Sequence, residues 1–220
     1  ITIADYVINP FVGCDFNCVY CYAKLNSTYQ KKRNKVGDDF VEAKANIIPL
    51  LKKELREKNP RHVLIGSTTD GYQHCEATTA VMRDILELLN NNDITYTILT
   101  KYHRIERDLD LIGKNPHNEV YFTVNSLNEH ARLLLEPMAS SIAERKKAIQ
   151  AFHGNGIKVV LHAGPVIPGI TEARSLMDEF MGMCSMIEFE SLNLIMVDKV
   201  ALMTRLKVHF PGAFTEVQLL

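Results

Sequence analysis

Residues 9–22 read Asn9-Pro10-Phe11-Val12-Gly13-Cys14-Asp15-Phe16-Asn17-Cys18-Val19-Tyr20-Cys21-Tyr22. This stretch directly follows the first predicted strand, Tyr6–Ile8, and carries three cysteines with CxxxCxxC spacing on one loop. In folds built from parallel strands, the loops that follow the strands hold the ligands. The stretch therefore predicts the first strand end of such a fold, with a candidate metal site on it.

Along the rest of the chain, short β-branched runs alternate with longer stretches of helical apolar spacing. The pattern predicts six βα units in an α/β fold with parallel strands and outer helices, either a doubly wound sheet or an incomplete barrel. The predicted strands are Tyr6–Ile8, His62–Gly66, Thr95–Thr100, Glu119–Val124, Lys158–Ala163 and Ile187–Val197. The predicted helices are Phe40–Glu57, Thr78–Leu89, Ile105–Ile112, Ser141–His153, Glu172–Met183 and Ala201–His209.

Composition indicates a globular protein with one large core. Hydrophobic residues make up 46% of the 220 residues, and no linker divides the chain, so we expect a single domain over residues 1–220. The chain has no apolar run of the roughly 18 residues that span a bilayer and no signal peptide pattern, which predicts a cytoplasmic protein without membrane contact.

The charge balance argues against a general affinity for nucleic acid. The 25 basic residues nearly equal the 26 acidic residues, giving a net charge of −1. Contact with DNA would have to be local, at the dense basic run Lys31, Lys32, Arg33 and Lys35, which is more typical of a solvated loop.

Cys14, Cys18 and Cys21 are the candidate metal ligands. Soft thiolates suit an iron–sulfur cluster, and a cubane held by three cysteines keeps one iron open for another ligand. A structural zinc ion would need a fourth ligand, such as Cys75, Cys184 or a histidine. Three unrelated buried thiols are the remaining alternative.

The loop resembles the signature of the radical S-adenosylmethionine (radical SAM) superfamily, CxxxCxΦC, in which Tyr20 takes the aromatic position beside the cluster and its cofactor. Later blocks are similar to those of the spore photoproduct lyase-like branch, and together they cover most of residues 9–172. These blocks are Gly66-Ser67-Thr68-Thr69-Asp70-Gly71-Tyr72-Gln73, Leu99-Thr100-Lys101 with Arg107-Asp108, Leu135-Glu136-Pro137 with Arg145, and Pro165-Val166-Ile167-Pro168-Gly169.

The resemblance implies a partial (β/α)6 TIM-type barrel that binds a [4Fe-4S] cluster and SAM. The open iron would bind the amino and carboxylate groups of SAM. One electron, supplied by a flavodoxin- or ferredoxin-type donor, would then cleave SAM to methionine and a 5′-deoxyadenosyl radical that abstracts hydrogen from a substrate. Such a radical requires a closed cavity, which a barrel mouth provides.

The resemblance places Ser67, Thr68 and Asp70 at the methionyl amino group, although Asp70-Gly71 could equally form a turn into the next helix. Lys101 ends the third strand, where it could pair with the methionyl carboxylate or remain solvated. The ribose contacts would come from the end of the fourth strand, whose register the sequence leaves open. The candidates there are Thr123, Asn125 and Ser126.

After the fifth strand, residues 164–169 resemble an apolar wall against adenine, with Pro165 and Ile167 as its side chains. Glu136 and Arg145 could form an ion pair over the cofactor, or Arg145 could be a surface charge. His162 is expected to be a paired histidine within the barrel rather than a ligand.

The sequence departs from the lyase at the residue that returns hydrogen to the product. The lyase has a cysteine after the second strand, whereas Thr68 stands at about that position here. Tyr22, which matches the lyase pattern, and Cys75, if its loop folds back, are the candidate catalytic residues. Cys75 could otherwise be a small buried thiol.

Three functions are therefore compatible with the sequence. They are a radical SAM enzyme with an unidentified substrate, a lyase for thymine lesions in DNA, and a non-catalytic metal-binding barrel.

Overall fold

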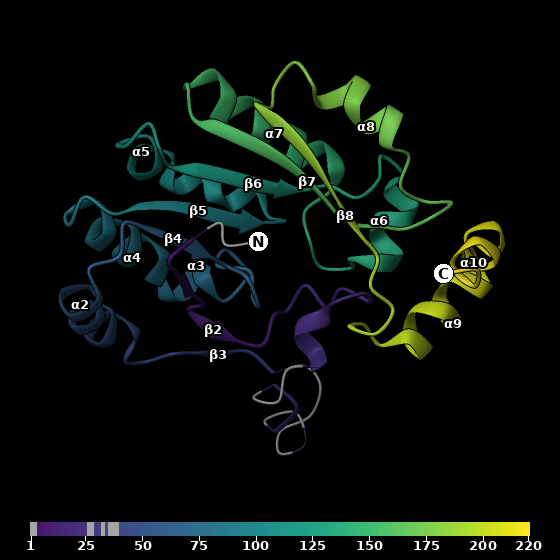
Figure 1. Ribbon diagram of the computed structural model, residues 1–220, viewed down its shortest axis with the longest axis horizontal. Coiled ribbons are helices and arrows are strands. Elements are labelled where there is room, and N and C mark those ends of the chain that lie inside the picture. Colours follow the sequence, from purple (N-terminus) through teal and green to yellow (C-terminus); the bar gives the residue numbers. More distant parts are fainter. Residues whose placement is uncertain (1–3, 26–28, 32–33, 35–39) are drawn as a thin grey trace.

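The computed structural model describes residues 4–25, 29–31, 34 and 40–220. Six strands form one curved sheet, and helices lie around its outer side (Figure 1). The strands are β1 (Tyr6–Ile8), β4 (His62–Ile65), β5 (Thr95–Thr100), β6 (Glu119–Thr123), β7 (Lys158–Val166) and β8 (Met186–Ser191).

All neighbouring strands in this sheet are parallel, and they follow one another in chain order. Parallel strands need crossover connections, which the helices supply. In the described part of the chain β1 and β8 each pair with one neighbour only, so the barrel is incomplete. The structure confirms the predicted partial (β/α)6 TIM-type fold and places the loops after the strands at one end of it.

The connections contain helices of very different lengths. The α-helices are α2 (Ile47–Lys58), α3 (Glu76–Thr79), α4 (Val81–Asn90), α5 (Leu109–Ile112), α6 (Glu129–Leu135), α7 (Ile142–Gly154), α8 (Ala173–Phe180), α9 (Lys199–His209) and α10 (Pro211–Val217). The described residues also form the 3-10 helices η1 (Tyr22–Leu25) and η2 (His103–Asp108).

Alternation along the strands separates the core from the inside of the barrel. In β6, Val120 and Phe122 belong to the hydrophobic core, and the Phe122 ring meets Phe152 of α7 at a centroid distance of 5.7 Å. Because side chains alternate between faces, Tyr121 and Thr123 point to the opposite, inner face. The inner face therefore ends in polar side chains at the top of β6.

The structure corrects several predicted boundaries. The segment predicted as a helix over residues 105–112 is a 3-10 helix as far as Asp108, and the strand predicted over residues 158–163 extends to Val166. The predicted helix over residues 40–57 begins only at Ile47, because β3 (Glu42–Ala43) pairs antiparallel with β2 (Phe11–Val12). The predicted helix over residues 78–89 is interrupted at Ala80, whose left-handed φ of 50° separates α3 from α4. The predicted strand over residues 187–197 ends at Ser191.

Helices α6 and α10 were not predicted, because each is only seven residues long and gives little periodic signal. Residues 32, 33 and 35 of the basic run lie outside the described residues. Among the described helices, none has the length and apolar character required to cross a membrane.

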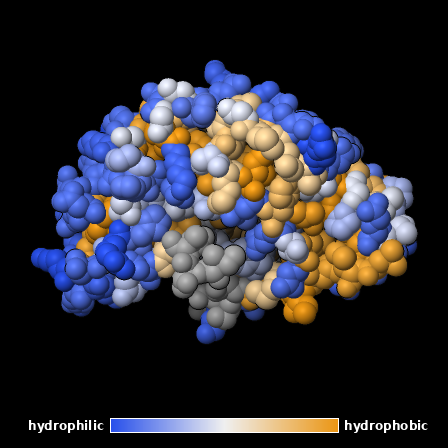
Figure 2. Space-filling model, turned by 45° about the horizontal axis from the view of Figure 1, so that its top comes forward, coloured by the Kyte–Doolittle hydropathy of each residue, from blue (hydrophilic) through white to orange (hydrophobic). Residues whose placement is uncertain are grey.

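Exposed apolar side chains gather toward the C-terminal helices. Figure 2 shows hydrophobic residues in the upper centre and on the right, the side of α9 and α10 in Figure 1, while hydrophilic residues predominate on the left. The most exposed of these side chains include Ile195, Val200, Val208, Leu219 and Leu220. In the barrel, the two edge strands also expose apolar side chains, among them Val7 of β1 and Met186 of β8.

Gly66, which follows β4, is a position where a side chain should be costly. Its φ is 93°, and an added Cβ would lie 2.7 Å from the carbonyl oxygen of Leu99. We expect Gly66→Ala to lower the free energy of unfolding by about 2 kcal/mol or more, since left-handed strain alone costs roughly 1–3 kcal/mol. Urea denaturation measures this change.

Gly154 provides the matched control, because it ends α7 and an added Cβ would meet no atom within 4 Å. Gly154→Ala should leave stability unchanged or raise it by up to about 1 kcal/mol. Equal losses in the two variants would contradict the prediction.

Candidate functional site

The three cysteines lie on residues 13–21, which we call the three-cysteine loop. Cys18 is buried, with 8% of its surface exposed, and Cys14 and Cys21 are half-buried. The loop turns through a left-handed Asn17, and the amide of Cys21 donates to the carbonyl of Cys18 at 3.2 Å. The thiols are thus carried by a compact turn after β1 and β2.

One side of the three-cysteine loop is fixed by the segment that follows β4. Thr69 Oγ1 donates to the carbonyl of Gly13 at 2.7 Å, and Gln73 Oε1 accepts from the amide of Asp15 at 2.9 Å. The amide of His74 donates to Asp15 Oδ2 at 3.0 Å. These bonds join two strand ends whose residues lie more than 50 positions apart in the chain.

The other side of the loop is fixed by the segment around Glu136. The amide of Val19 donates to the carbonyl of Leu135 at 2.9 Å. The hydroxyl of Tyr20 donates to Glu136 Oε1 and accepts from Asn125 Nδ2 at 2.7 Å. Tyr20 therefore links the three-cysteine loop to the end of β6.

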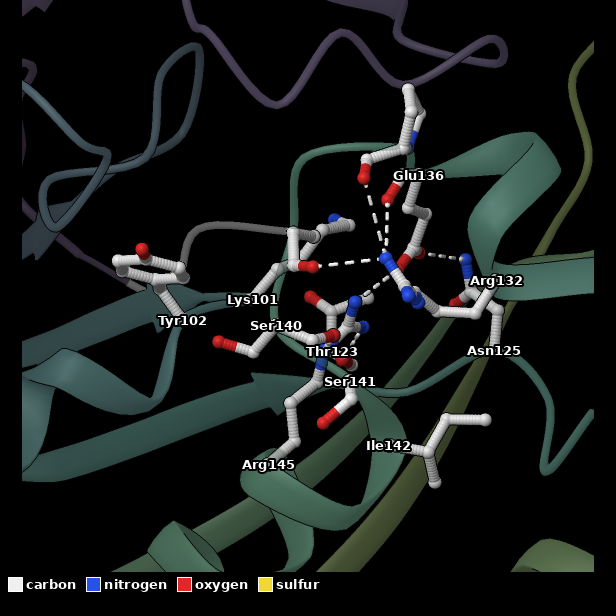
Figure 3. A network of polar contacts seen from close by, with 12 residues as sticks. Lys101, Tyr102, Thr123, Asn125, Arg132, Glu136, Ser140, Ser141, Ile142 and Arg145 are labelled. Atoms are coloured by element: carbon white, nitrogen blue, oxygen red, sulfur yellow. Dashed lines mark hydrogen bonds and ion pairs between the residues drawn. The ribbon is translucent and has the colours of Figure 1, made fainter. Parts of the chain in front are cut away.

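Glu136 and Arg145 form a buried ion pair, which confirms that alternative of the sequence analysis. Arg145 also donates to the carbonyls of Thr123 at 2.8 Å and Ser140 at 2.9 Å (Figure 3). Burial acts to raise the pKa of Glu136, but the charges of Arg145 and Lys101 outweigh it and hold that pKa below its usual value. Glu136 is therefore a carboxylate inside the protein.

Arg132 of α6 fixes the backbone beyond Glu136. Its guanidinium, which lies beside Glu136 in Figure 3, donates to the carbonyls of Glu136 at 3.3 Å, Pro137 at 3.4 Å and Ala139 at 3.0 Å. The same side chain pairs with Glu129. Two arginines thus hold this connection against the strand ends.

The three thiols can be compared with the needs of a metal site. Among the described residues, no three His, Cys, Asp or Glu side chains gather closely enough to hold one metal ion. In a [4Fe-4S] cubane each thiolate binds its own iron, so the ligands occupy separate corners. Burial raises the pKa of Cys14 well above its usual value and that of Cys18 to about 12, so these thiols need a metal's positive charge to ionise.

Asp70 lies at the strand ends as expected, but its carboxylate is already used within the protein. It accepts from the amides of Tyr72 and Lys101, both at 2.8 Å, and from Thr100 Oγ1 at 2.9 Å. Burial raises the pKa of Asp70, and these bonds oppose part of the rise. The turn described as its alternative is therefore present, and Asp70 fixes the end of β5.

Ser67 and Thr68 are placed beside the three-cysteine loop by Asn9. The Asn9 side chain donates to Ser67 Oγ at 3.1 Å and accepts from the amide of Thr68 at 3.0 Å. The hydroxyl of Tyr22 donates to the carbonyl of Ser67. The structure thus brings Ser67, Thr68 and the candidate catalytic Tyr22 together.

Lys101 is directed toward the same region. Its Nζ lies 5.8 Å from the centre of the Tyr20 ring, and its charge acts on Glu136 and Cys18. The predicted cation therefore lies next to the three-cysteine loop, joined to Asp70 through its backbone amide rather than through its side chain.

The end of β6 presents two buried polar atoms without a partner. Thr123 Oγ1 and Asn125 Oδ1 accept and donate no hydrogen bond among the described residues. A buried polar atom without a partner costs about 1–3 kcal/mol, so these atoms suit a polar ligand. Ser126 has a local role, because its Oγ accepts from the amide of Asn128 at 3.1 Å.

The expected adenine wall is only partly available. Ile167 is fully buried in the hydrophobic core, and Thr171 caps its amide at 2.9 Å. Pro165, which follows a cis peptide bond from Gly164, remains half-buried. Of the two side chains, only Pro165 could contact a ligand in this arrangement.

Cys75 directly precedes α3 and is half-buried. Burial raises its pKa to about 11, with a contribution from the charge of Asp15 in the three-cysteine loop. Among the described residues, no hydrogen bond connects Cys75 with Tyr22, so the structure does not join the two candidate catalytic residues.

Two cavities lie around these segments. The larger has a volume of about 400 Å³ between α3 and η2, and none of its lining residues is a predicted site residue. The smaller, about 20 Å³, is lined by Tyr20, Asn125, Ser126 and Glu136 among others. It has room for about one water molecule, so a cofactor at this place would require the lining to open.

Sequence reasoning missed the role of two residues that hold the loops in place, Asn9 and Gln73. Both lie in stretches quoted for other reasons, and Asn9 directly follows the end of β1. Attention to every polar residue after a strand would have found them.

The sequence model of the radical SAM superfamily matches residues 8–180. An uncharacterized protein of Methanocaldococcus jannaschii is 31% identical over 192 residues, which are 87% of this chain and 71% of that protein. An uncharacterized protein of Mycobacterium tuberculosis is 29% identical over 185 residues, 80% of this chain. The chain spans 54% of this mycobacterial relative.

Solved structures share the fold. A spore photoproduct lyase mutant with bound AdoMet and dinucleoside spore photoproduct matches with a TM-score of 0.68 and 20% identity, covering 93% of this chain and 61% of that one. Streptococcus suis SuiB bound to S-adenosylmethionine matches with a TM-score of 0.61 and 15% identity, covering 97% of this chain and 45% of that one.

Proposed function

This chain belongs to the radical SAM superfamily and is an enzyme of that class, and we propose that Cys14, Cys18 and Cys21 hold a [4Fe-4S] cluster whose fourth iron binds SAM. When bound and reduced, the cluster supplies the electron that cleaves SAM to a 5′-deoxyadenosyl radical, which abstracts hydrogen from the substrate. In this proposal, residues 1–220 form one radical SAM core domain.

The observation that carries the proposal is the fixing of the three-cysteine loop from both sides. Bonds from Thr69 and Gln73 on one side, and from Leu135 and Glu136 on the other, hold the thiols at the strand ends. The unpaired atoms of β6 lie at the same end of the barrel. Contacts within the protein therefore hold the loop at this end of the barrel.

We assign the remaining predicted residues to SAM according to polarity. Lys101 provides the cation for the methionyl carboxylate, and the hydroxyls of Ser67 and Thr68 serve the amino group. Asn125 provides a polar atom for the ribose, and Tyr20 and Pro165 provide apolar surface. Asp70 has an indirect role, because its hydrogen bonds with Thr100 and with the amide of Lys101 fix the end of β5.

Radical SAM enzymes require a reductant, and we propose a flavodoxin- or ferredoxin-type donor. The substrate is unidentified. A second candidate function, cleavage of thymine lesions in DNA, is favoured by Tyr20 and Tyr22 but opposed by Thr68, because a hydroxyl gives up a hydrogen atom far less readily than a thiol. Membership of an enzyme class argues against the non-catalytic metal-binding barrel.

Electron paramagnetic resonance of the anaerobically reconstituted, reduced protein tests the proposal. We expect the signal of a reduced [4Fe-4S] cluster that changes when SAM is added, together with formation of 5′-deoxyadenosine. A signal that SAM leaves unaltered would contradict an open iron. A parallel reaction with lesion-bearing DNA separates the two candidate functions. Only a lesion lyase should abstract a hydrogen atom from this DNA and repair the lesion.

Replacement of Lys101 should weaken SAM binding. We expect Lys101→Ala to raise the dissociation constant roughly ten-fold to a hundred-fold, because a hydrogen bond to a charged group contributes about 1.5–3 kcal/mol. Iron content should not change, since Lys101 is no metal ligand. Equilibrium dialysis with labelled SAM measures the effect, and Lys53→Ala on the exposed side of α2 is the control. An affinity for SAM within two-fold of wild type would contradict this role and indicate that Lys101 is a solvated lysine.

A further inference from the structure

His162, Glu188 and Glu190 form an acidic cluster on the inner face of the sheet. His162 of β7 is in register with Glu188 of β8, and its Nδ1 lies 2.6 Å from Glu188 Oε1. Its Nε2 lies 3.4 Å from Glu190 Oε2. Leu161 and Ala163 on either side belong to the hydrophobic core, so alternation directs His162 to the inner face.

The acidic cluster carries more negative charge than its own histidine could neutralise. Among the described residues, neither Glu188 nor Glu190 forms an ion pair with lysine or arginine. Even a protonated His162 would neutralise only one of the two carboxylates. The three groups also do not gather closely enough to hold a metal ion. The uncompensated charge is therefore available to an organic cation.

A second observation at this face is independent of the acidic residues. Thr123 is fully buried, its Oγ1 has no partner among the described residues, and it stands in register with His162 on the neighbouring strand. Partners in register point to the same face of a sheet. An unpartnered buried hydroxyl beside the acidic cluster indicates a ligand with a polar atom at this place.

Gly164 and Tyr22 lie near the acidic cluster. Gly164 follows on the same face, and a Cβ there would lie 2.1 Å from His162 Nε2, so the imidazole occupies the space of a missing side chain. Glu190 lies within electrostatic range of Tyr22, which directly follows the three-cysteine loop. The acidic cluster therefore lies toward the same end of the barrel as the three-cysteine loop.

We propose that Glu188 and Glu190 bind a cationic group of the substrate, an ammonium or a guanidinium, with His162 positioning Glu188. The inference rests on the proposed function and adds the chemical class of its substrate. Carboxylates bind such groups through charge-assisted hydrogen bonds, which are roughly twice as strong as neutral ones. The same charges repel phosphate groups, which argues against DNA in this position.

Binding of capped tripeptides tests the inference without knowledge of the natural substrate. The probes are acetylated, amidated Ala-X-Ala peptides with lysine, arginine or norleucine at X, and a thymidine dinucleotide. Calorimetry at low ionic strength should give the lysyl or arginyl probe at least ten-fold tighter binding than the norleucyl probe. The two cationic probes distinguish an ammonium from a guanidinium.

The double substitution Glu188→Gln/Glu190→Gln should remove this preference while the urea midpoint stays unchanged. The matched control is Glu54→Gln/Glu57→Gln on α2, which changes the charge equally at exposed positions and should keep the preference. A preference that survives in the cluster variant, or a wild-type protein without any preference, would overturn the inference.

Iron content and SAM binding of the same preparations separate the two claims. A wild-type protein that holds iron and binds SAM but does not distinguish the probes refutes the acidic cluster as a cation site and leaves the proposed function. A protein that prefers cationic probes but holds no cluster refutes the proposed function instead.

Discussion

Replacing Cys14, Cys18 or Cys21 with alanine is expected to abolish SAM cleavage. A cubane needs a thiolate at each protein-held iron, and the described residues offer no fourth cysteine in the same loop. Each single variant should therefore lose the cluster or hold it incompletely. Production of 5′-deoxyadenosine by the reduced protein, with iron and sulfide analysis, measures both effects.

Two further substitutions serve as controls. Cys184→Ser should retain SAM cleavage, because Cys184 follows α8 and lies outside the three-cysteine loop. Cys75→Ser combined with Cys184→Ser should keep about four irons per chain, as one cubane requires. Loss of half the iron in this pair, or intact cleavage in Cys18→Ala with normal iron content, would refute the assigned ligand set.

Arg145→Met is expected to have the largest effect on stability. It would leave Glu136 buried and charged with its main partner removed, and breaking a buried ion pair from one side costs about 3–5 kcal/mol. The variant also loses the bonds to the carbonyls of Thr123 and Ser140. Urea denaturation of the cluster-free protein, compared with wild type in the same state, measures the loss.

A second substitution separates the ion pair from simple packing. Glu136→Leu combined with Arg145→Met removes both charges and should recover a substantial part of the lost stability. Arg174→Met, which breaks an exposed pair with Asp178, should change stability by less than about 1 kcal/mol. Equal losses in the single and double variants would show that the buried charge of Glu136 is not the cause.

The architecture could be predicted because its signals are local. Strands such as Tyr6–Ile8 and Thr95–Thr100 have the predicted boundaries, since each is a short β-branched run next to turn residues. The break at Ala80 was not predictable, because a left-handed alanine carries no composition signal. The antiparallel pairing of Glu42–Ala43 depends on contacts with residues 30 positions away.

The site was predictable in its motif but not in its contacts. The spacing of Cys14, Cys18 and Cys21 identifies the loop from sequence alone. The role of Asp70 as an acceptor for Thr100 and Lys101 could not be predicted, because only the folded sheet brings these residues together. Glu190 could not be recognised, because the strand register that turns it inward is not visible in the sequence.

The two-sided fixing of the three-cysteine loop has a consequence for the lifetime of the enzyme. Iron–sulfur clusters are lost by oxidation, and a loop that folded only around its metal would become disordered at each loss. Here the loop loses its conformational entropy when the barrel folds. The hydrogen bonds with Thr69 and Gln73 on one side and with Glu136 on the other offset that loss. We expect the loop to stay ordered without the proposed cluster, so that rebuilding the cluster would require delivery of iron and sulfide but no refolding.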